Sequence, residues 1–377
     1  MAPIRVALLG LSNSAATSWA KGAHLPYLLS PRGRAKYEIV ALVNSSIESA
    51  QKAIKDFNLP PGTKAYGDPQ SVAADPDVDL VVCSVRVDKH HQLVRPSIEA
   101  GKAVYSEWPL AQDLDHARDL ADLAREKGVR TLIGTQGRVA PVVLKIRELL
   151  EQGRIGKVLS SEVRAAGGTN DRSILPTFIS YFADRSIGGN VVTIGFAHVF
   201  DAVLTAIGEV GNLQSVVQLQ RPSVPIQDRE TKKIVQTIKS DVPDLVIATG
   251  TFLPSKTVQD GSTLLFRFRR GQPFPGEEPL VWTINGEKGE IRLVSPGGTA
   301  IQANAFTEPI VIKVHDFETD SVERVNWDWA DWQKELPEIS RNVGGLYEAF
   351  ADGDGGRYPT FDDALKRHEQ VDAILSG

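Results

Sequence analysis

Residues 104–111 read VYSEWPLA, and the fold class of the chain can be worked out from this stretch. It follows the apolar run Leu80–Val85, a short helix-like stretch at Leu93–Ala100 and a turn at Gly101-Lys102. This order places the stretch at the end of a strand in a series of alternating strands and helices. In open α/β sheets the carboxyl ends of the strands are where ligands bind. We therefore expect this stretch to contribute to a binding site.

The first 137 residues repeat the same alternation. Ile4–Gly10 reads as a buried strand that ends in glycine, and Tyr37–Val43 and Thr131–Gly134 are further apolar runs. Leu114–Lys127 has apolar residues at helical spacing, an aspartate in its first turn and a glycine just past its end. Strands that alternate with helices predict a doubly wound parallel (Rossmann) sheet, here in an α/β domain at residues 1–137.

The remainder of the chain, residues 138–377, has a different pattern. Helices are expected only around residues 195–207, 332–351 and 361–375, with a glycine-rich loop at residues 353–356. Many strands and few helices predict an α+β domain on a large, mostly antiparallel sheet, one face of which needs cover, so we expect a homodimer or higher oligomer. The strands expected from alternating apolar residues are Val158–Ala165, Leu213–Leu219, Leu264–Phe268, Leu280–Ile284, Ile291–Val294 and Ile310–Val314.

Composition excludes several classes of protein. A chain of 377 residues is expected to form two domains, and its net charge of -5 argues against nucleic-acid binding. The single cysteine, Cys83, lies in an apolar run, which predicts a small buried hydrophobe and no disulfide framework. No apolar run approaches the roughly 18 residues of a membrane span, and we expect no signal peptide, because the N-terminus runs directly into a strand. The expected location is the cytoplasm, with access to the nucleus.

The loop after the first strand is the candidate dinucleotide site. The fingerprint G-x-G-x-x-G supplies a tight turn, close approach of the phosphates, and packing of the helix on the strand. Gly10, Ser12 and Ala15 occupy these positions, so only the first glycine is kept, although serine and alanine are small enough for the same geometry. The alternative is a plain strand-loop-helix turn. Asn44, after the second strand, is neither the carboxylate that favours NAD nor the arginine that favours NADP, so the choice between them stays open.

The stretch at residues 104–111 resembles the glucose-fructose oxidoreductase/inositol dehydrogenase superfamily, which has Glu-Lys-Pro at this place. Glu107 and Pro109 match, but Trp108 replaces the lysine that handles the proton beside the nicotinamide in the family. Over nearly its whole length the chain resembles a fungal subgroup, the galactose-regulon repressor and its relatives, and it departs from this subgroup in the tail. The residues that carry this resemblance are Gly10-Leu11, Trp19-Ala20, His24, Glu107-Trp108, Gln136-Gly137-Arg138, Pro141, Leu144, Glu148-Leu149, Gln152-Gly153, Ile155-Gly156, Val242-Pro243-Asp244, Gly250-Thr251, Gly286 and Lys288-Gly289.

The resemblance implies NAD or NADP as cofactor and no metal. His90 matches the histidine of the family's Asn-x-x-His run, where Val87 replaces the asparagine, and we expect a structural or cofactor-edge role for it. The residues that the resemblance and the fold assign to the cofactor are Gly10, Ser12, Asn13, Ala15, Asn44, Ser45, Val85, His90, Glu107, Trp108 and Gln136.

A second family signature is a glycine run followed by Asp-x-x-x-His, in which both polar residues share one helix face. His198 keeps the histidine, whereas Ile194 replaces the aspartate. Removal of a hydroxyl proton needs an acceptor, which an indole is not, whereas an imidazole titrates near neutrality. We therefore expect His198 and Tyr181 to be catalytic; the alternative for His198 is a hydrogen-bonded helix residue. The expected substrate ligands are Trp108, Arg138, Asn170, Asp171, Arg172 and His198.

Three hypotheses about function follow. In the first, the protein is an NAD(P)-binding oxidoreductase-type enzyme, or a redox-recycling lyase or epimerase, that acts on a hydroxylated or carbonyl small molecule. In the second, it is a non-enzymatic regulator that senses NAD(P) and binds a regulatory protein partner. In the third, it is a catalytically silent dimer. The replaced lysine and aspartate favour regulation, and the retained His198 favours catalysis. We take the enzyme as the leading hypothesis.

Overall fold

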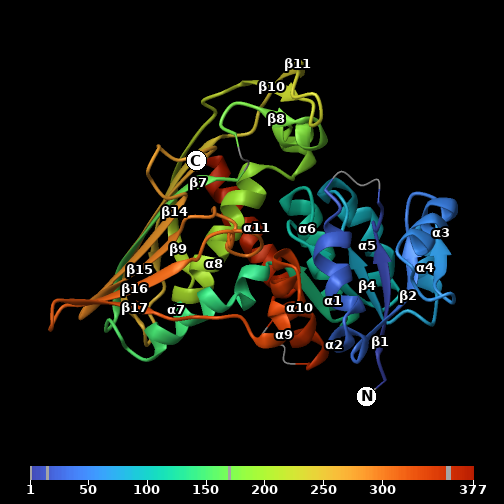
Figure 1. The fold of residues 1–377 in the computed structure, drawn as a ribbon, viewed down its shortest axis with the longest axis horizontal. Helices are drawn as coiled ribbons and strands as arrows, with labels where there is room; N and C mark the ends of the chain where they lie inside the picture. The colour runs from blue at the N-terminus through green and yellow to red at the C-terminus, as the bar shows by residue number, and fades with distance from the viewer. Residues whose placement is uncertain (1, 14–16, 169–170, 354–357) are drawn as a thin grey trace. The chain divides into compact units, whose positions relative to one another are not determined.

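The computed structural model describes residues 2–13, 17–168, 171–353 and 358–377 (Figure 1). The chain forms two compact units. The first unit comprises Met1–Gln136, Ser186–Gly189 and Asp331–His368, and the second comprises Gly137–Arg185, Asn190–Ala330 and Glu369–Gly377.

Six parallel strands form the sheet of the first unit, in the order β3-β2-β1-β4-β5-β6 (Figure 1). All residues of β4 and β6 are buried, as expected of a parallel sheet that helices cover on both faces. The strand order reverses between β1 and β4, and this confirms the doubly wound topology. The strands are β1 (Ile4–Leu9), β2 (Tyr37–Val43), β3 (Lys64–Tyr66), β4 (Leu80–Cys83), β5 (Ala103–Glu107) and β6 (Thr131–Gly134).

The helices of this unit begin and end where the local sequence predicts. Helix α6 has the expected bounds, because the Asp113 carboxylate caps it by accepting from the His116 N–H, and Gly128 ends it at a φ of 63°. Apart from short 3-10 turns, the helices of this unit are η1 (Ala20–His24), α1 (Leu25–Leu29), α2 (Pro31–Arg34), α3 (Ile47–Asp56), α4 (Pro69–Ala74), α5 (His90–Glu99), α6 (Leu114–Lys127), α9 (Asp331–Lys334) and α10 (Glu338–Ala351), with α11 (Phe361–Ser376) shared between the units.

Residues 331–368 pack in the first unit, whereas the sequence placed them in a second domain at 138–377. The reason is a set of aromatic contacts made by α10. The Tyr347 ring stacks on Tyr27 with ring centroids 5.3 Å apart, and the Tyr37 hydroxyl donates to the Tyr347 carbonyl oxygen at 2.6 Å. These partners lie more than 300 positions apart in the sequence, so no local pattern predicts the contact. The main boundary, after Gln136, lies one residue from the expected division at 137/138.

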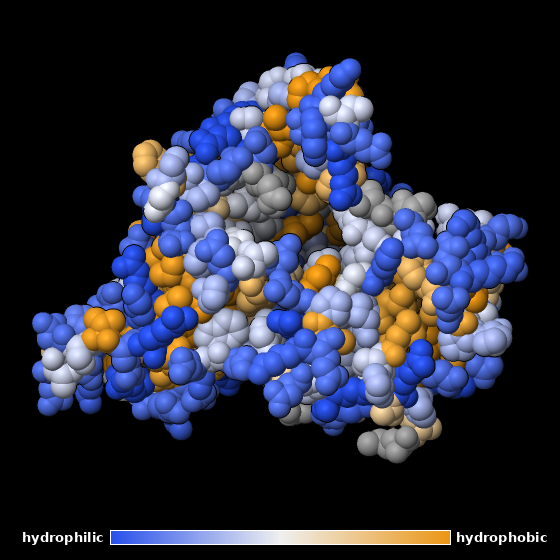
Figure 2. All heavy atoms as spheres, in the orientation of Figure 1, coloured by the Kyte–Doolittle hydropathy of each residue, from blue (hydrophilic) through white to orange (hydrophobic). Residues whose placement is uncertain are grey.

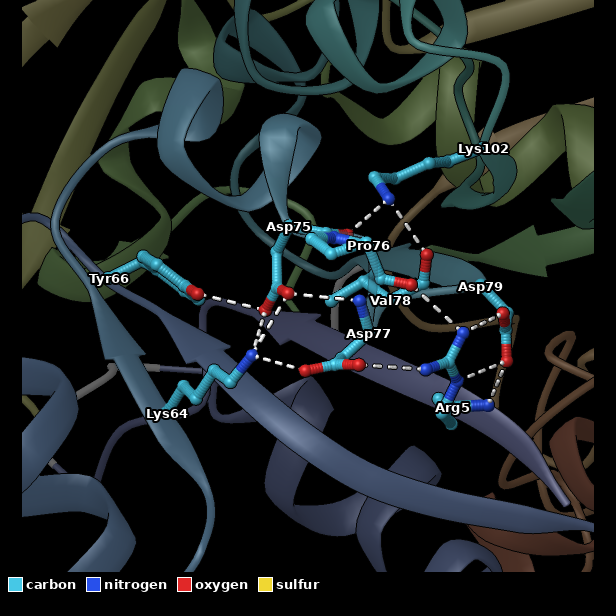
Figure 3. A network of polar contacts seen from close by, with 9 residues as sticks. All are labelled: Arg5, Lys64, Tyr66, Asp75, Pro76, Asp77, Val78, Asp79 and Lys102. Carbon is cyan, nitrogen blue, oxygen red and sulfur yellow. Dashed lines mark hydrogen bonds and ion pairs between the residues drawn. The ribbon is translucent and has the colours of Figure 1, made fainter.

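A charged network ties together the amino ends of the strands (Figure 3). The Arg5 guanidinium pairs with Asp79 at 2.8 Å and also with Asp77, while Lys64 pairs with Asp75 at 2.9 Å and with Asp77 at 2.8 Å. Because β1 and β3 are not neighbours, these ion pairs join strands that share no hydrogen-bond ladder. The amino-edge network consists of Arg5, Lys64, Tyr66, Asp75, Asp77, Asp79 and Lys102.

The second unit is built on an eight-stranded sheet in the order β17-β16-β15-β14-β7-β13-β12-β9. Neighbouring strands are antiparallel except β7 and β13, and this confirms the expected large, mostly antiparallel sheet. Each expected strand is present, with bounds longer or shifted by a few residues. The strands are β7 (Val158–Gly167), β9 (Val210–Gln218), β12 (Leu245–Phe252), β13 (Val258–Arg270), β14 (Leu280–Gly286), β15 (Gly289–Ser295), β16 (Val311–Asp316) and β17 (Ser321–Val325).

Helices cover one face of this sheet, which we call the inner face. Helix α8 (Ala197–Ile207) continues the π-helical segment η6 (Val191–Phe196), and α7 (Pro141–Glu151) packs in the same core (Figure 1). The Phe196 ring meets Phe266 of β13 edge-on, with centroids 5.0 Å apart. Side chains alternate along each strand, so the residues between these buried ones point to the opposite, outer face.

Two further details differ from the expected pattern. The helix expected at 332–351 is two helices, α9 and α10, because Pro337 stands at the N-cap of α10 and interrupts the first. A separate three-stranded sheet was not expected and contains β8 (Leu175–Pro176), β10 (Ser223–Gln227) and the exposed strand β11 (Ile234–Lys239). The loop expected at 353–356 lies almost entirely outside the described residues.

The surface facing the viewer in Figure 2 is hydrophilic over most of its area, with apolar residues in small groups. Within the described parts of the chain, no helix combines the length and the apolar character that crossing a bilayer requires. Cys83 is buried in β4, and burial raises the pKa of its thiol to about 12.

Candidate functional site

The predicted cofactor residues, where described, all follow the carboxyl ends of strands in the first unit. Parallel strands end at one edge of a sheet, so the structure brings these residues to a single edge, which we call the carboxyl edge. Ala15 lies outside the described residues. The residues at this edge are Gly10, Ser12 and Asn13 after β1, Asn44 and Ser45 after β2, Val85 and His90 after β4, Glu107 and Trp108 at the end of β5, and Gln136 after β6.

Gly10 is required by the fold itself. Its φ is +91°, and a β-carbon there would lie 2.5 Å from the Ser84 carbonyl oxygen and 2.5 Å from Cγ1 of Val85. The backbone at the end of β1 therefore runs close against the end of β4. This tight turn is the geometry that a dinucleotide loop needs, but the glycine would be needed without any cofactor.

The loop after β1 is held by two asparagines. The Asn44 amide nitrogen donates to the Leu11 carbonyl oxygen at 3.0 Å and to the Ser49 carbonyl oxygen at 3.3 Å. The Asn13 side chain donates to Asp56 at 3.2 Å and accepts from Lys21 at 3.0 Å. Asn44 therefore fixes the path of the loop with its amide nitrogen. Ser45 beside it is exposed, and this pair brings no carboxylate to the end of β2.

Glu107 is the centre of a buried polar group at the carboxyl edge. One carboxylate oxygen lies 3.0 Å from Nε2 of His24, and the other accepts from Nε2 of Gln136 at 2.8 Å. The contact with His24 has the distance of an ion pair but not the angles of a hydrogen bond. A β-carbon at Gly134 would lie 2.4 Å from this carboxylate, so the glycine in β6 makes the room that Glu107 occupies.

His24 extends this group toward α10. Its Nδ1 lies 2.9 Å from the Tyr347 hydroxyl, and its ring centroid lies 5.1 Å from that of Tyr105. Burial raises the pKa of both tyrosines well above the ordinary value, so their hydroxyls stay protonated. The buried cluster consists of His24, Tyr105, Glu107, Gln136 and Tyr347. The sequence assigned no role to Tyr105 or Tyr347, and His24 entered only as part of the family resemblance.

Trp108 is a packed residue, 6% exposed, on the peptide that leaves β5. Its bond to Pro109 is cis, and its ring centroid lies 4.8 Å from that of His368. Nε2 of His368 accepts from the Leu110 N–H at 3.1 Å, which requires that nitrogen to be unprotonated. Burial lowers the pKa of His368 to about 4, in agreement with a neutral ring. His368 is a neighbour of the site that the sequence did not reveal.

His90 joins the end of β4 to the turn after β5. Its Nδ1 lies 3.0 Å from the Pro109 carbonyl oxygen, and its Nε2 lies 3.0 Å from the Val85 carbonyl oxygen. A neutral imidazole donates to only one of the two, and burial holds the pKa of His90 below its ordinary value. These contacts join the end of β4 to the turn after β5, and the structural or cofactor-edge role expected for His90 stays a prediction.

The predicted catalytic residues belong to the second unit. His198 is buried in the first turn of α8, and Tyr181 lies in the 3-10 segment η4 (Thr177–Ala183). Arg138 directs Nε and Nη2 at the Asp201 carboxylate, with an Nη2–Oδ1 distance of 2.9 Å. The donors used in this ion pair are not open to a substrate, so the role of Arg138 as a substrate ligand stays a prediction.

Two further predicted substrate residues, Asp171 and Arg172, lie on a loop before β8. Asp171 accepts from the N–H groups of Ser173 and Ile174 at 2.7 and 2.8 Å, which closes a turn. Arg172 is exposed, and its Nε donates to Oε1 of Gln272 at 3.1 Å. Asn170 lies outside the described residues.

Family models match both halves of the chain. Residues 4–135 match the oxidoreductase family with an NAD-binding Rossmann fold, and residues 141–295 match the C-terminal domain of Gal80p. The chain is 31% identical to dehydrogenase aclE of Aspergillus oryzae, over 99% of this chain and 95% of that protein. It is 27% identical to the galactose/lactose metabolism regulatory protein GAL80 of Saccharomyces cerevisiae, over 99% of this chain and 92% of that protein.

A solved structure agrees with these matches. A super-repressor mutant of Gal80p from Saccharomyces cerevisiae superposes with a TM-score of 0.85 at 25% identity, covering 100% of this chain and 96% of that one. The chain therefore belongs to the glucose-fructose oxidoreductase/inositol dehydrogenase family of NAD-binding oxidoreductases, near its Gal80 subgroup.

Proposed function

We propose that this protein is an NAD(P)-dependent oxidoreductase-type enzyme that acts on a hydroxylated or carbonyl small molecule. The observation that carries the proposal is the carboxyl edge of the parallel sheet, where Gly10 turns tightly beside the end of β4 at the reversal of strand order. The full-length similarity to a dehydrogenase supports it. A redox-recycling lyase or epimerase would use the same parts.

The first unit would hold the dinucleotide. The turn at Gly10 would hold the pyrophosphate, and Asn44, which fixes the Leu11 carbonyl, would support the start of the loop after β1. Neither Asn44 nor Ser45 decides between NAD and NADP. When bound, the nicotinamide supplies or accepts the hydride. Besides Gly10, Asn44 and Ser45, the residues proposed to bind the dinucleotide are Ser12, Asn13, Ala15, Val85, His90, Glu107, Trp108 and Gln136.

His198 would move the proton in this proposal. The family lysine is replaced by Trp108, whose indole N–H only donates, so the substrate hydroxyl needs another acceptor. His198 matches the family histidine and lies in the first turn of α8, with Tyr181 as the second proposed catalytic group. Trp108 would act through its shape, as a flat apolar wall for the ligand. Further proposed substrate ligands are Arg138, Asn170, Asp171 and Arg172.

The test incubates the protein with NAD+ or NADP+ and a panel of sugars, polyols and hydroxy acids. Absorbance follows net redox change, and product masses detect a redox-neutral reaction. His198→Ala should lower turnover roughly 100-fold or more, the usual contribution of a general acid or base. His315→Ala, which changes a half-buried histidine of the same unit, serves as the control and should retain turnover. If His198→Ala turns over like the control, His198 is not the proton carrier.

A second candidate function is regulation without catalysis. Trp108 at the lysine position and the similarity to a galactose/lactose metabolism regulatory protein favour it. The protein would then bind NAD(P) as a sensor and a regulatory protein as its partner. Calorimetric binding of a nicotinamide dinucleotide without turnover of any panel compound would select this candidate. Failure of all four nicotinamide forms to bind at millimolar concentration would remove the cofactor from both candidates.

We further propose a cytoplasmic homodimer, with access to the nucleus, in which the first unit binds the dinucleotide and the second binds substrate and its second copy. The outer face of the eight-stranded sheet would form the interface, because an antiparallel sheet of this size has a second face to cover. Light scattering tests the assembly, and a stable particle of 41.0 kDa at micromolar concentration would contradict it.

A further inference from the structure

Four arginines line a pocket of about 360 Å³ on the outer face of the eight-stranded sheet. Arg164 belongs to β7, and Arg267 and Arg269 belong to β13, where they alternate with buried core residues. Arg172 reaches the pocket from the loop before β8. The volume lies within the range of small-molecule sites. The rest of the lining is Ala166, Pro273, Phe274, Pro275, Glu277 and Glu278.

The charges in this pocket are not balanced. Four guanidinium groups face two carboxylates, Glu277 and Glu278, so four minus two leaves an excess of two positive charges. Arg164 pairs with Glu277. Arg267 stands directly beside Arg164 in the register of β13 and β7, and its side chain makes no hydrogen bond or ion pair with any described residue. Like charges that face each other across strands destabilise a sheet. The Arg164–Arg267 pair therefore lowers the stability of the sheet, and nothing in the fold requires it.

Within the described residues, the side chains of the other two arginines donate hydrogen bonds only to neutral groups. Arg269 donates to the Gln272 carbonyl oxygen at 2.8 Å, and Arg172 donates to the Gln272 side chain. Burial, together with the positive charges of Arg267 and Arg172, lowers the pKa of Arg269. The electrostatic environment of this guanidinium therefore favours the arrival of an anion.

The wall of the pocket is fixed by backbone geometry. Gly271 has a φ of +87°, and a β-carbon there would lie 2.4 Å from atoms of Arg172. Oε1 of Gln272 accepts from the backbone N–H of Arg172 at 3.2 Å, and its Nε2 donates to Asp171 at 3.2 Å. Arg172 is thus held in place at its backbone, and this distinguishes the pocket from a chance gathering of mobile surface side chains.

We propose that this pocket binds a small phosphate ester. A guanidinium fork matches two phosphate oxygens at once, and a dianionic phosphate offsets the excess of two positive charges, which a single carboxylate does not. The organic part of the ligand would lie against Pro273 and Phe274, which is 71% exposed. The pocket occupies the end of the outer face where β7 and β13 finish. The proposal does not depend on the enzymatic function proposed above, but it requires this end of the outer face to stay open, so in the proposed homodimer the second copy would cover the face beyond this pocket.

The test is calorimetric titration with phenyl phosphate, with succinate as the dicarboxylate control, at constant ionic strength. The informative variant is Arg267→Gln, which removes a charge but no side-chain hydrogen bond or ion pair within the described residues. Its matched control is Arg292→Gln, because Arg292 is also an exposed arginine on the outer face but lies outside this pocket. Circular dichroism should show both variants folded, since neither side chain makes a hydrogen bond or ion pair within the described residues and the backbone pairing of the strands is unchanged.

We expect Arg267→Gln to raise the Kd for phenyl phosphate about 10-fold, the value of one charged hydrogen bond, and Arg292→Gln to change it less than about 2-fold. Glu278→Gln should tighten binding, because it removes a negative charge from the pocket. Succinate should bind more weakly than phenyl phosphate. The proposal is overturned if no binding is detected, if both arginine variants weaken it equally, or if succinate binds as tightly.

Discussion

The two edges of the six-stranded sheet hold their polar side chains in opposite ways. At the amino edge, most charged residues pair where water also reaches them: the side chains of Arg5, Lys64 and Asp77 are 36%, 41% and 57% exposed, and only that of Asp75, at 3%, is buried among the ion pairs described above. At the carboxyl edge, His24 and Gln136 are 0% and 1% exposed and are held by other protein groups. A polar group that loses its partner near water is resolvated, whereas a buried one is left unsatisfied. The same sheet therefore has a tolerant edge and a sensitive edge, and the candidate cofactor site lies on the sensitive one.

Removing one carboxylate from each edge is the strongest test of this difference in tolerance. Glu107→Ala should lower the free energy of unfolding by about 3–5 kcal/mol, because it strips a buried partner from both His24 and Gln136. Asp77→Ala should cost at most about 1 kcal/mol, and less at high salt, because its partners are exposed. Urea unfolding measures both. Equal losses would mean that the two edges do not differ in the way described.

Two glycines, one at each edge, test the same difference by how tightly their surroundings are packed. Gly134→Ala places a methyl group 2.4 Å from the Glu107 carboxylate and should cost roughly 3 kcal/mol, the upper part of the range for overpacking. Gly62, before β3 at the amino edge, has open space around its α-carbon and no left-handed backbone. Gly62→Ala should be neutral or stabilise by about 0.5 kcal/mol. Thermal unfolding of both variants decides the matter, and a neutral Gly134→Ala would show that Glu107 is free to move.

The two edges should also respond to acid in different pH ranges. His368 has a pKa of about 4 in the folded chain against 6.5 for the free side chain. The unfolded state therefore binds more protons between these values, so stability is complete above pH 6.5 and is lost as the pH falls toward 4. We expect a loss of roughly 2 kcal/mol, reduced from the full shift because part of the residue contacts solvent.

His368→Gln keeps an acceptor near the Leu110 N–H but does not titrate, so its stability should be flatter than wild type between pH 7 and about 4.5. At the amino edge, the hydrogen bond from Arg5 lowers the pKa of Asp79 below 3.8. The stability that the Asp79 carboxylate contributes is present above pH 3.8 and is lost only in stronger acid. Asp79→Asn should therefore leave the slope above about pH 4.5 unchanged. A steep slope that survives in His368→Gln would place the acid-sensitive group elsewhere.

Much of the fold could be predicted from the sequence, because apolar periodicity and helix capping each involve residues that are close together in the chain. The apolar runs that became β1, β2 and β4, and the capped helix Leu114–Lys127, each depend on residues within a few positions of one another. For the candidate site, the sequence predicted only the residues that directly follow the ends of strands. Gly10, His90 and Glu107 lie at the expected edge, because parallel strands must end together.

The sequence by itself determined the two-part organisation of the chain, the loop after β1 and the loss of the family lysine at Trp108, because each depends on periodicity or on a single position. Only the tertiary structure decided that α10 returns to the first unit, that Tyr347 lies 2.9 Å from a histidine 323 positions earlier, and that Arg138 is engaged by Asp201. It also decided that Arg172 and three strand arginines share one pocket. Contacts of this kind join segments whose patterns are independent of each other, so they are set by how whole elements pack and not by any stretch of sequence that can be read alone.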